Sequence, residues 1–415
     1  MRRLSMLAAT AFAALCLAAP ASQAEFDFAD VNTGLPNDPA VPAFPGTKAI
    51  WAGTCDLSSA SAGNGGVGTA PTIRAHCIDV GDSSLGAPPP SDSPWPAGQE
   101  PDWRLDPVIE AGGHPDGTAT FWFNYREGAT APAEDVKDIV VKLPPGVVGN
   151  PEALPKCSAI ASQAVPPDCP ASAQVGITTL GFPEGISDAV HEARDLQTKA
   201  VYNVEARDTV TAEFLIARVG NLFNVAITAR GRTNGDYGID TLALLIPEFV
   251  PLGGQAFTFW GVPWAQEHDI WRIDGADTPS NDPAHVHTGF PAEIQQSYDP
   301  SWGPIRPFFS NPTECSGQPL PVTTEVDSWQ NPVSRGGSWI SATVQTDVLS
   351  GCEELLFEPQ ITLKPTVSVS DSPSGLDVTL ATPQNNDPPA ALPGNPDLAH
   401  DPADDTGAPA YWKTP

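Results

Sequence analysis

Apolar and polar residues alternate over several short stretches of the chain, which is the pattern of β-strands with one buried face. The first stretch has an apolar side chain at every second position, namely at Ala119, Phe121, Phe123 and Tyr125. A second covers residues 136–143 and ends at Pro144-Pro145-Gly146, a sequence typical of turns. Beyond the first 24 residues no window keeps a period of 3.6 residues, so the pattern predicts strands rather than helices.

Residues 211–247 give the clearest prediction, a meander of three antiparallel strands. Alternating residues at 212–216 and 223–229 flank Gly220-Asn221, and Asn234-Gly235 precedes an apolar run at 239–246. Two-residue linkers of this kind between alternating segments are strong hairpin signals, because Gly and Asn adopt positive φ readily.

Further strands are expected at five places, 255–262, 320–329, 338–347, 361–369 and 376–382. The chain also has 47 Pro and 36 Gly, which interrupt regular structure, while 11 Trp indicate packed cores. The predicted fold class is mostly β: sandwich-like antiparallel sheets with long Pro/Gly-rich loops and local disulfides.

The N-terminus has the three parts of a secretory signal peptide in their usual order. Arg2 and Arg3 form a positive region, residues 4–20 are apolar and uncharged, and Ser22 and Ala24 offer a cleavage site before Glu25. This predicts a secreted protein, extracellular or at the cell surface, with no integral membrane segment after cleavage.

Charge narrows the range of partners. Without residues 1–24 the chain keeps 18 basic and 50 acidic side chains, a net charge of −32. Such a chain is repelled by nucleic acid and by anionic membrane surfaces, so neither is an expected partner. Cell-wall glycans or other surface proteins are the partners that we expect.

Six cysteines remain after cleavage, and an even number in an exported chain predicts three disulfides. In an antiparallel hairpin, the midpoint of a cross-strand pair marks the turn. The midpoints of Cys55–Cys77 and Cys315–Cys352 fall in turn-rich sequences, at Gly66 and at Val333-Ser334. Cys157 and Cys169 are then left to each other. A cysteine-based zinc site is the weaker reading, because the chain has no C-x-x-C pair.

Composition divides the chain into four parts. Residues 1–24 are the signal peptide, and residues 25–105 form a Pro/Ser/Gly-rich segment with one disulfide hairpin, expected between Lys48 and Val80. Residues 106–370 contain the main β region. Residues 371–415 read as the start of a further β module that ends in a disordered, acidic, Pro-rich tail.

Three stretches are similar, as a group, to a known kind of protein: 143–151 (LPPGVVGNP) with the two cysteines that follow, 259–272 (FWGVPWAQEHDIWR), and 307–330, which contains NPTEC and DSWQ. Together they resemble a family of large secreted β-domain repeat proteins of high-GC Gram-positive soil bacteria. The resemblance covers roughly residues 105–400. It implies export and repeated β modules, and it brings no activity or catalytic residues with it. The absence of a second LPxG-NP motif before Pro415 predicts either a truncated copy or a short relative of these proteins.

The tryptophan-rich segment 259–272 is the first candidate site. Its indoles could provide flat faces for sugar rings, with carboxylates supplying polar contacts; the residues are Trp260, Trp264, Glu267, Asp269 and Trp271. The alternative is that these aromatic side chains anchor a long loop onto the sheet, and we favour it by roughly three to one because aromatics fill cores readily.

A histidine cluster is the second candidate. His285 and His287 would point to one side of a strand, and His268 lies nearby in the sequence, so these residues are the candidate ligands of a zinc site. An H-x-H pair in a polar loop is more often unliganded. No cofactor is expected; loop-bound calcium, from the acidic residues at 274–282, and zinc are the alternatives.

These observations favour a secreted or cell-surface structural or adhesive β-module protein without catalytic activity. The first alternative is a carbohydrate-binding protein or glycosidase that uses segment 259–272. The second is a metal-dependent hydrolase that uses His268, His285 and His287. The sequence contains no G-x-S-x-G motif and no P-loop, which is why the non-enzymatic class comes first.

Overall fold

The computed structural model describes residues 26–29, 50–57, 75–78, 107–124, 132–183, 194–207, 210–219, 222–233, 235–279, 289–355, 360–367 and 369–381. The predicted signal peptide, His285, His287 and the predicted tail lie outside these residues.

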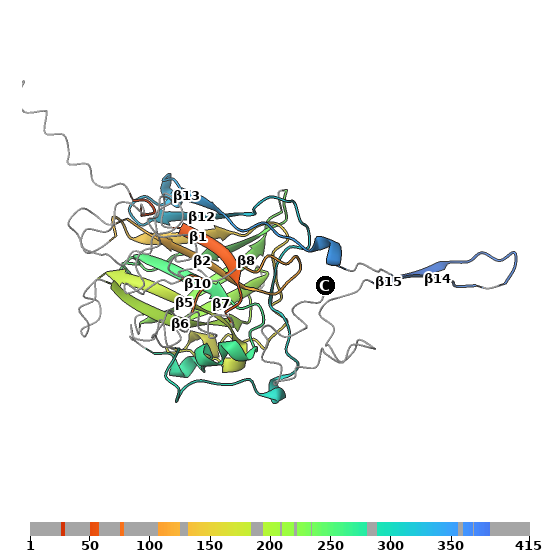
Figure 1. Ribbon diagram of the computed structural model, residues 1–415, viewed down its shortest axis with the longest axis horizontal. Helices are drawn as coiled ribbons and strands as arrows, with labels where there is room; N and C mark the ends of the chain where they lie inside the picture. Colours follow the sequence, from red (N-terminus) through yellow and green to blue (C-terminus); the bar gives the residue numbers. More distant parts are fainter. Residues whose placement is uncertain are drawn as a thin grey trace, which may run out of the picture.

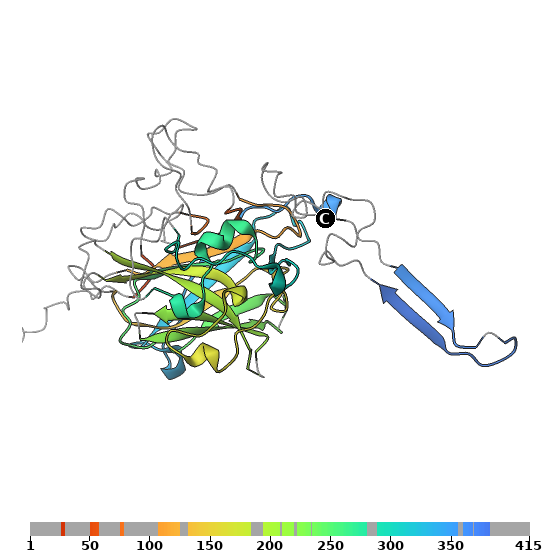
Figure 2. The same ribbon diagram turned by 90° about the horizontal axis from the view of Figure 1, so that it is seen from below.

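In the part of the chain that the structure describes, eleven antiparallel strands form one large sheet. Figures 1 and 2 show how this sheet curls. The strands are β1 (Ile50–Cys55), β2 (Asp116–Trp122), β3 (Val136–Lys142), β5 (Gln174–Pro183), β6 (Arg194–Val204), β7 (Ala212–Val219), β8 (Phe223–Gly231), β9 (Ile239–Ala243), β10 (Gly254–Phe259), β12 (Pro321–Ser328) and β13 (Ile340–Gln345). The order across the sheet is β1-β2-β10-β5-β6-β7-β8-β9-β3-β12-β13. The end strands β1 and β13 lie close together, so the sheet curls into two facing layers. The mostly β, sandwich-like antiparallel prediction is confirmed.

The predicted meander is present. β7 pairs with β8 and β8 pairs with β9, each in antiparallel register. The alternating residues Phe214, Ile216 and Ile227 point into one apolar core, as the pattern of period two requires. The predicted strands near 136–143, 255–262, 320–329 and 338–347 also form, as β3, β10, β12 and β13.

The strands β5 and β6 were not predicted, although they are the longest in the sheet. Both faces of β5 are buried: Ile177 packs on the outer side, and Leu180 on the inner side. A strand that is covered on both faces has no alternation of apolar and polar residues. Its threonines, Thr178 and Thr179, are also fully buried.

Two cores stabilise the fold. Between the layers, inward-facing side chains from distant strands meet in a single apolar cluster that includes Phe121, Ile139, Phe214 and Val326. On the outer face, loops cover the strands from β1 to β7 and bury a second cluster, with Trp51, Trp122, Tyr202, Trp260 and Trp271. Helical structure is limited to short 3-10 segments such as η3 (Gln266–Trp271), and among the described residues no helix is long and apolar enough to cross a membrane.

All three predicted disulfides form, with Cα–Cα distances of 5.5 Å for Cys55–Cys77, 5.1 Å for Cys157–Cys169 and 5.9 Å for Cys315–Cys352. The disulfide Cys315–Cys352 lies just beyond the open end of the β12–β13 hairpin, as expected for a pair that flanks a hairpin. For Cys55–Cys77 the strand pairing is different. Cys55 ends β1, whose antiparallel partner is β2, and the described residues around Cys77 form no extended strand.

Two small sheets accompany the large one. β4 (Val148–Gly149) pairs with β11 (Phe309–Ser310). β14 (Gln360–Pro365) and β15 (Leu376–Ala381) form a hairpin that stands away from the main body (Figure 2) and confirms the last two predicted strands. This hairpin crosses the predicted boundary at residue 370.

Candidate ligand-binding cavity

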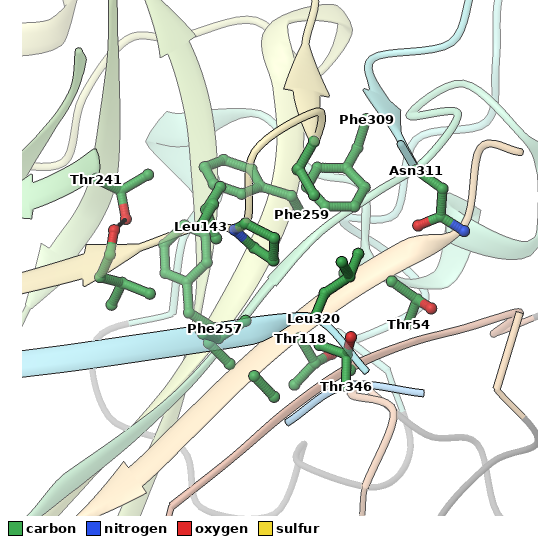
Figure 3. Close-up of a pocket in the computed structure, with 18 of the residues that line it drawn as sticks. Thr54, Thr118, Leu143, Thr241, Phe257, Phe259, Phe309, Asn311, Leu320 and Thr346 are labelled. Atoms are coloured by element: carbon green, nitrogen blue, oxygen red, sulfur yellow. Dashed lines mark hydrogen bonds between the residues drawn. The ribbon is translucent and has the colours of Figure 1, made fainter. Parts of the chain in front are cut away.

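A cavity of about 110 Å³ lies between the two layers of the sheet. Figure 3 shows its lining, which is mainly aromatic and aliphatic. Representative residues are Leu143, Val147, Phe257, Phe259, Phe309 and Leu320. An apolar, concave site with a few polar groups is the usual form of a small-molecule binding site.

Small residues on the inner face of β1 and β2 leave this space open. Across three strands, Gly117 lies between Thr54 and Phe259, and Ala119 lies between Ala52 and Phe257. A Cβ atom at Gly117 would lie 2.8 Å from the ring of Phe309, too close for van der Waals contact. The lack of a side chain at Gly117 therefore lets the ring of Phe309 pack directly against the backbone of β2. Gly117 and Ala119 are both only half-buried, so other side chains do not fill the space over this part of the inner face.

The segment 143–151 contributes to the lining of the cavity. Leu143, Pro144 and Val147 belong to the lining. The turn depends on Gly146, which has a φ of +88° and whose missing Cβ would lie 2.9 Å from Pro312. The β4–β11 pairing then joins this segment to residues 309–310. All three stretches on which the family resemblance rests thus contribute residues to the cavity, the segment 259–272 through Phe259.

Few polar side chains line the cavity. The hydroxyl of Thr54 donates a hydrogen bond to the carbonyl of Val108 at 2.8 Å, and the amide of Asn311 donates to the same carbonyl at 3.1 Å. On the opposite layer, the hydroxyl of Thr241 donates to the carbonyl of Val141 at 3.4 Å. Polar groups at fixed positions in an apolar pocket are what orients a ligand.

The three tryptophans of segment 259–272 are buried. Trp264 packs on Tyr298 and Trp302 at ring distances of 5.7 and 5.8 Å, and its indole N–H donates to the carbonyl of Ser172. Trp260 and Trp271 lie in the outer core. With this burial the indoles offer no open face to a sugar ring, and they hold the loop on the sheet.

His268 lies fully buried beneath this loop and pairs with Asp116 of β2. Its Nε2 is 3.2 Å from the carboxylate of Asp116, its Nδ1 is 3.1 Å from the carbonyl of Val262, and its ring stacks on Trp260 at 4.5 Å. Because a carbonyl and a carboxylate can only accept, both ring nitrogens must donate, and the imidazole is positively charged. Neither nitrogen is left to take a proton from a substrate.

The surroundings of His268 raise its pKa, which is consistent with a proton on both ring nitrogens. Burial alone would lower the pKa of His268, but the charge and hydrogen bond of Asp116, with the charge of Glu267, raise it overall. Burial raises the pKa of Glu267 itself. Asp269 is held by an ion pair with the buried Arg272, whose guanidinium also donates to the carbonyls of Pro263 and Ala265.

We expect the free energy of unfolding to fall as the pH rises above 6.5, the ordinary pKa of histidine. The folded state keeps the proton of His268 to a higher pH than the unfolded chain does. The stabilisation is therefore complete below pH 6.5 and is lost as the pH rises through the folded-state pKa. The raised pKa of Glu267 acts in the same direction, from its ordinary value of 4.5 upward. Urea unfolding between pH 6.5 and 9 measures the decline, which should be smaller in His268→Gln; equal declines would contradict this account.

The described residues do not form the metal site that the second alternative requires. His268 is committed to Asp116, and the part of the chain that the structure describes holds no group of three His, Cys, Asp or Glu side chains placed to bind an ion. Asp274 accepts a hydrogen bond from the main chain of Ala171 at 2.7 Å, which fixes a loop crossing.

The cavity residues were not predicted from the sequence. The available signals were the turn-rich stretch 143–151 and the small residues Gly117 and Ala119 in an otherwise aromatic strand. Comparison with known proteins adds no assignment, because no family model, curated protein or solved structure matches the chain.

Proposed function

We propose that this protein binds a small apolar molecule in the cavity between the layers of its sheet. The observation that carries the proposal is a cavity of about 110 Å³, lined mainly by aromatic and aliphatic side chains and left open by small residues on β2. An engineered cavity of about 150 Å³ with similar lining binds benzene, so this space suits a body of one small ring or a short chain.

The wider setting follows from the sequence. The predicted signal peptide and the disulfides support a protein that is secreted or held at the cell surface. The hydrogen bonds that occupy both ring nitrogens of His268 support a role without catalysis. A structural or adhesive role within such a setting stays a prediction, and ligand binding in the cavity is compatible with it.

Toluene binding tests the proposal. We expect saturable binding of toluene to the wild-type protein, measured by isothermal titration calorimetry, and at least a tenfold weaker affinity in Gly117→Val, because the new side chain drives Phe309 into the cavity. Ala119→Leu fills the same space from a neighbouring position and should act alike.

Gly231→Val is the matched control, because a Cβ at Gly231 meets no atom within 4 Å. It should bind toluene like the wild type. Thermal unfolding of each variant shows that it is folded. Absence of binding to the wild type, or unchanged binding in both filled variants, would refute the proposal.

A further inference from the structure

The side chain of Asn311 at the cavity is fixed in one orientation. It is only 3 % exposed, and its Nδ2 donates to the carbonyls of Val108 at 3.1 Å and Glu110 at 3.0 Å. Two carbonyls cannot both face an amide oxygen, so the nitrogen must lie on their side and Oδ1 on the other. Figure 3 shows this oxygen on the side of Leu320. Among the described residues it accepts no hydrogen bond.

Thr54 also presents a hydrogen-bond acceptor, its hydroxyl oxygen, to the cavity. Its hydroxyl proton is used in the 2.8 Å hydrogen bond to Val108, so only lone pairs remain on its oxygen. Because Thr54 and Asn311 donate to the same carbonyl, the two side chains lie at the same place in the lining. The nearby hydroxyl of Thr346 is likewise used, on the carbonyl of Asp347 at 3.3 Å.

This part of the cavity therefore offers hydrogen-bond acceptors whose own donors are already occupied. A hydrogen-bond donor on a ligand in the cavity would find a partner in these acceptors, whereas a ligand without a donor would leave them unpaired. We infer, on the basis of the proposed function, that the ligand is a small apolar alcohol or amine whose O–H or N–H binds Asn311 and Thr54. The net charge of −30 also favours a ligand with a donor, since it attracts protonated amines and repels carboxylates.

Benzyl alcohol and anisole provide a direct test, because they are isomers that differ in having or lacking a hydrogen-bond donor. Toluene serves as the apolar reference. The quantity measured is the ratio of the anisole dissociation constant to that of benzyl alcohol, by isothermal titration calorimetry. We expect this ratio to fall roughly five- to tenfold in Asn311→Leu and to fall also in Thr54→Val, because each variant removes an acceptor for the alcohol but not for anisole.

Comparing the ratio between proteins cancels the difference in hydrophobicity of the two isomers. Thr323→Val is the matched control for Thr54→Val, since it removes a hydroxyl that pairs with Thr343 at 2.8 Å and is not part of the cavity lining, and it should leave the ratio unchanged. If Asn311→Leu does not fold, Thr54→Val carries the test alone. Toluene binding with a ratio that is equal in wild type and acceptor variants would overturn the inference and leave the proposed function standing. Absence of toluene binding to the wild type would overturn both.

Discussion

Replacing Asp116 by Ala should lower the free energy of unfolding by about 3–5 kcal/mol, the cost of removing one partner from a buried ion pair. The carboxylate of Asp116 faces the charged His268 and also accepts the main-chain N–H of Gly261 at 2.8 Å and of Leu57 at 3.3 Å. The variant leaves a buried charge and two buried N–H groups without an acceptor. Urea unfolding at pH 6, where the imidazole is charged, measures the effect.

Asp168→Ala is the control for that measurement, because Asp168 is exposed and its carboxylate makes no hydrogen bond with a described residue. It should change stability by less than about 0.5 kcal/mol. A loss below about 1 kcal/mol in Asp116→Ala would show that His268 is neutral or that water replaces the carboxylate.

Trp260→Ala should also lower the free energy of unfolding by about 3–5 kcal/mol, the range for truncating a large aromatic side chain in a core. The indole is fully buried, and the variant opens a cavity and removes the face on which His268 stacks at 4.5 Å with an angle of 9° between the rings. The stacking adds a cation–π contribution because the imidazole is charged.

The matched control is Trp339→Ala, since Trp339 is 36 % exposed and should cost far less. Equal losses in the two variants would contradict the anchoring role of segment 259–272. A small loss in Trp260→Ala, together with lost binding to a glycan, would instead favour the carbohydrate hypothesis.

The strands that could be predicted are those with one face turned to solvent or with a clear turn beside them. β7, β8 and β9 alternate and are joined by short turn sequences, and the sequence placed them correctly. β5 and β6 were missed because both of their faces are buried, by the inner core and by the loops on the outer side. Covering loops depend on contacts between distant segments, which local patterns do not encode.

The strand that pairs with β1 and the position of the cavity also depend on contacts between distant segments, and neither could be predicted from local patterns. Midpoint reasoning found the right pairs, yet the partner of β1 is β2, 61 residues further along the chain from Cys55 to Asp116, and not a strand around Cys77. The conspicuous tryptophans are core residues, while the cavity is defined by side chains that are missing, at Gly117 and Ala119. The only sequence signal of a cavity is a small residue at an inward-facing position, and small residues also occur for many other reasons.

The order of the disulfides has a consequence for oxidative folding. The six cysteines that follow the predicted signal peptide allow 15 complete pairings. Here the first is bonded to the second, the third to the fourth and the fifth to the sixth, so that no closed loop overlaps another. When the chain is exported with its N-terminus first, Cys77, Cys169 and Cys352 each appear after the cysteine to which they are bonded in the native protein. If each pair forms as soon as its second cysteine appears, only the native partner is free at that moment. We therefore expect an oxidant that acts during emergence to form the native set without reshuffling, so that added disulfide isomerase should not raise the yield of native protein.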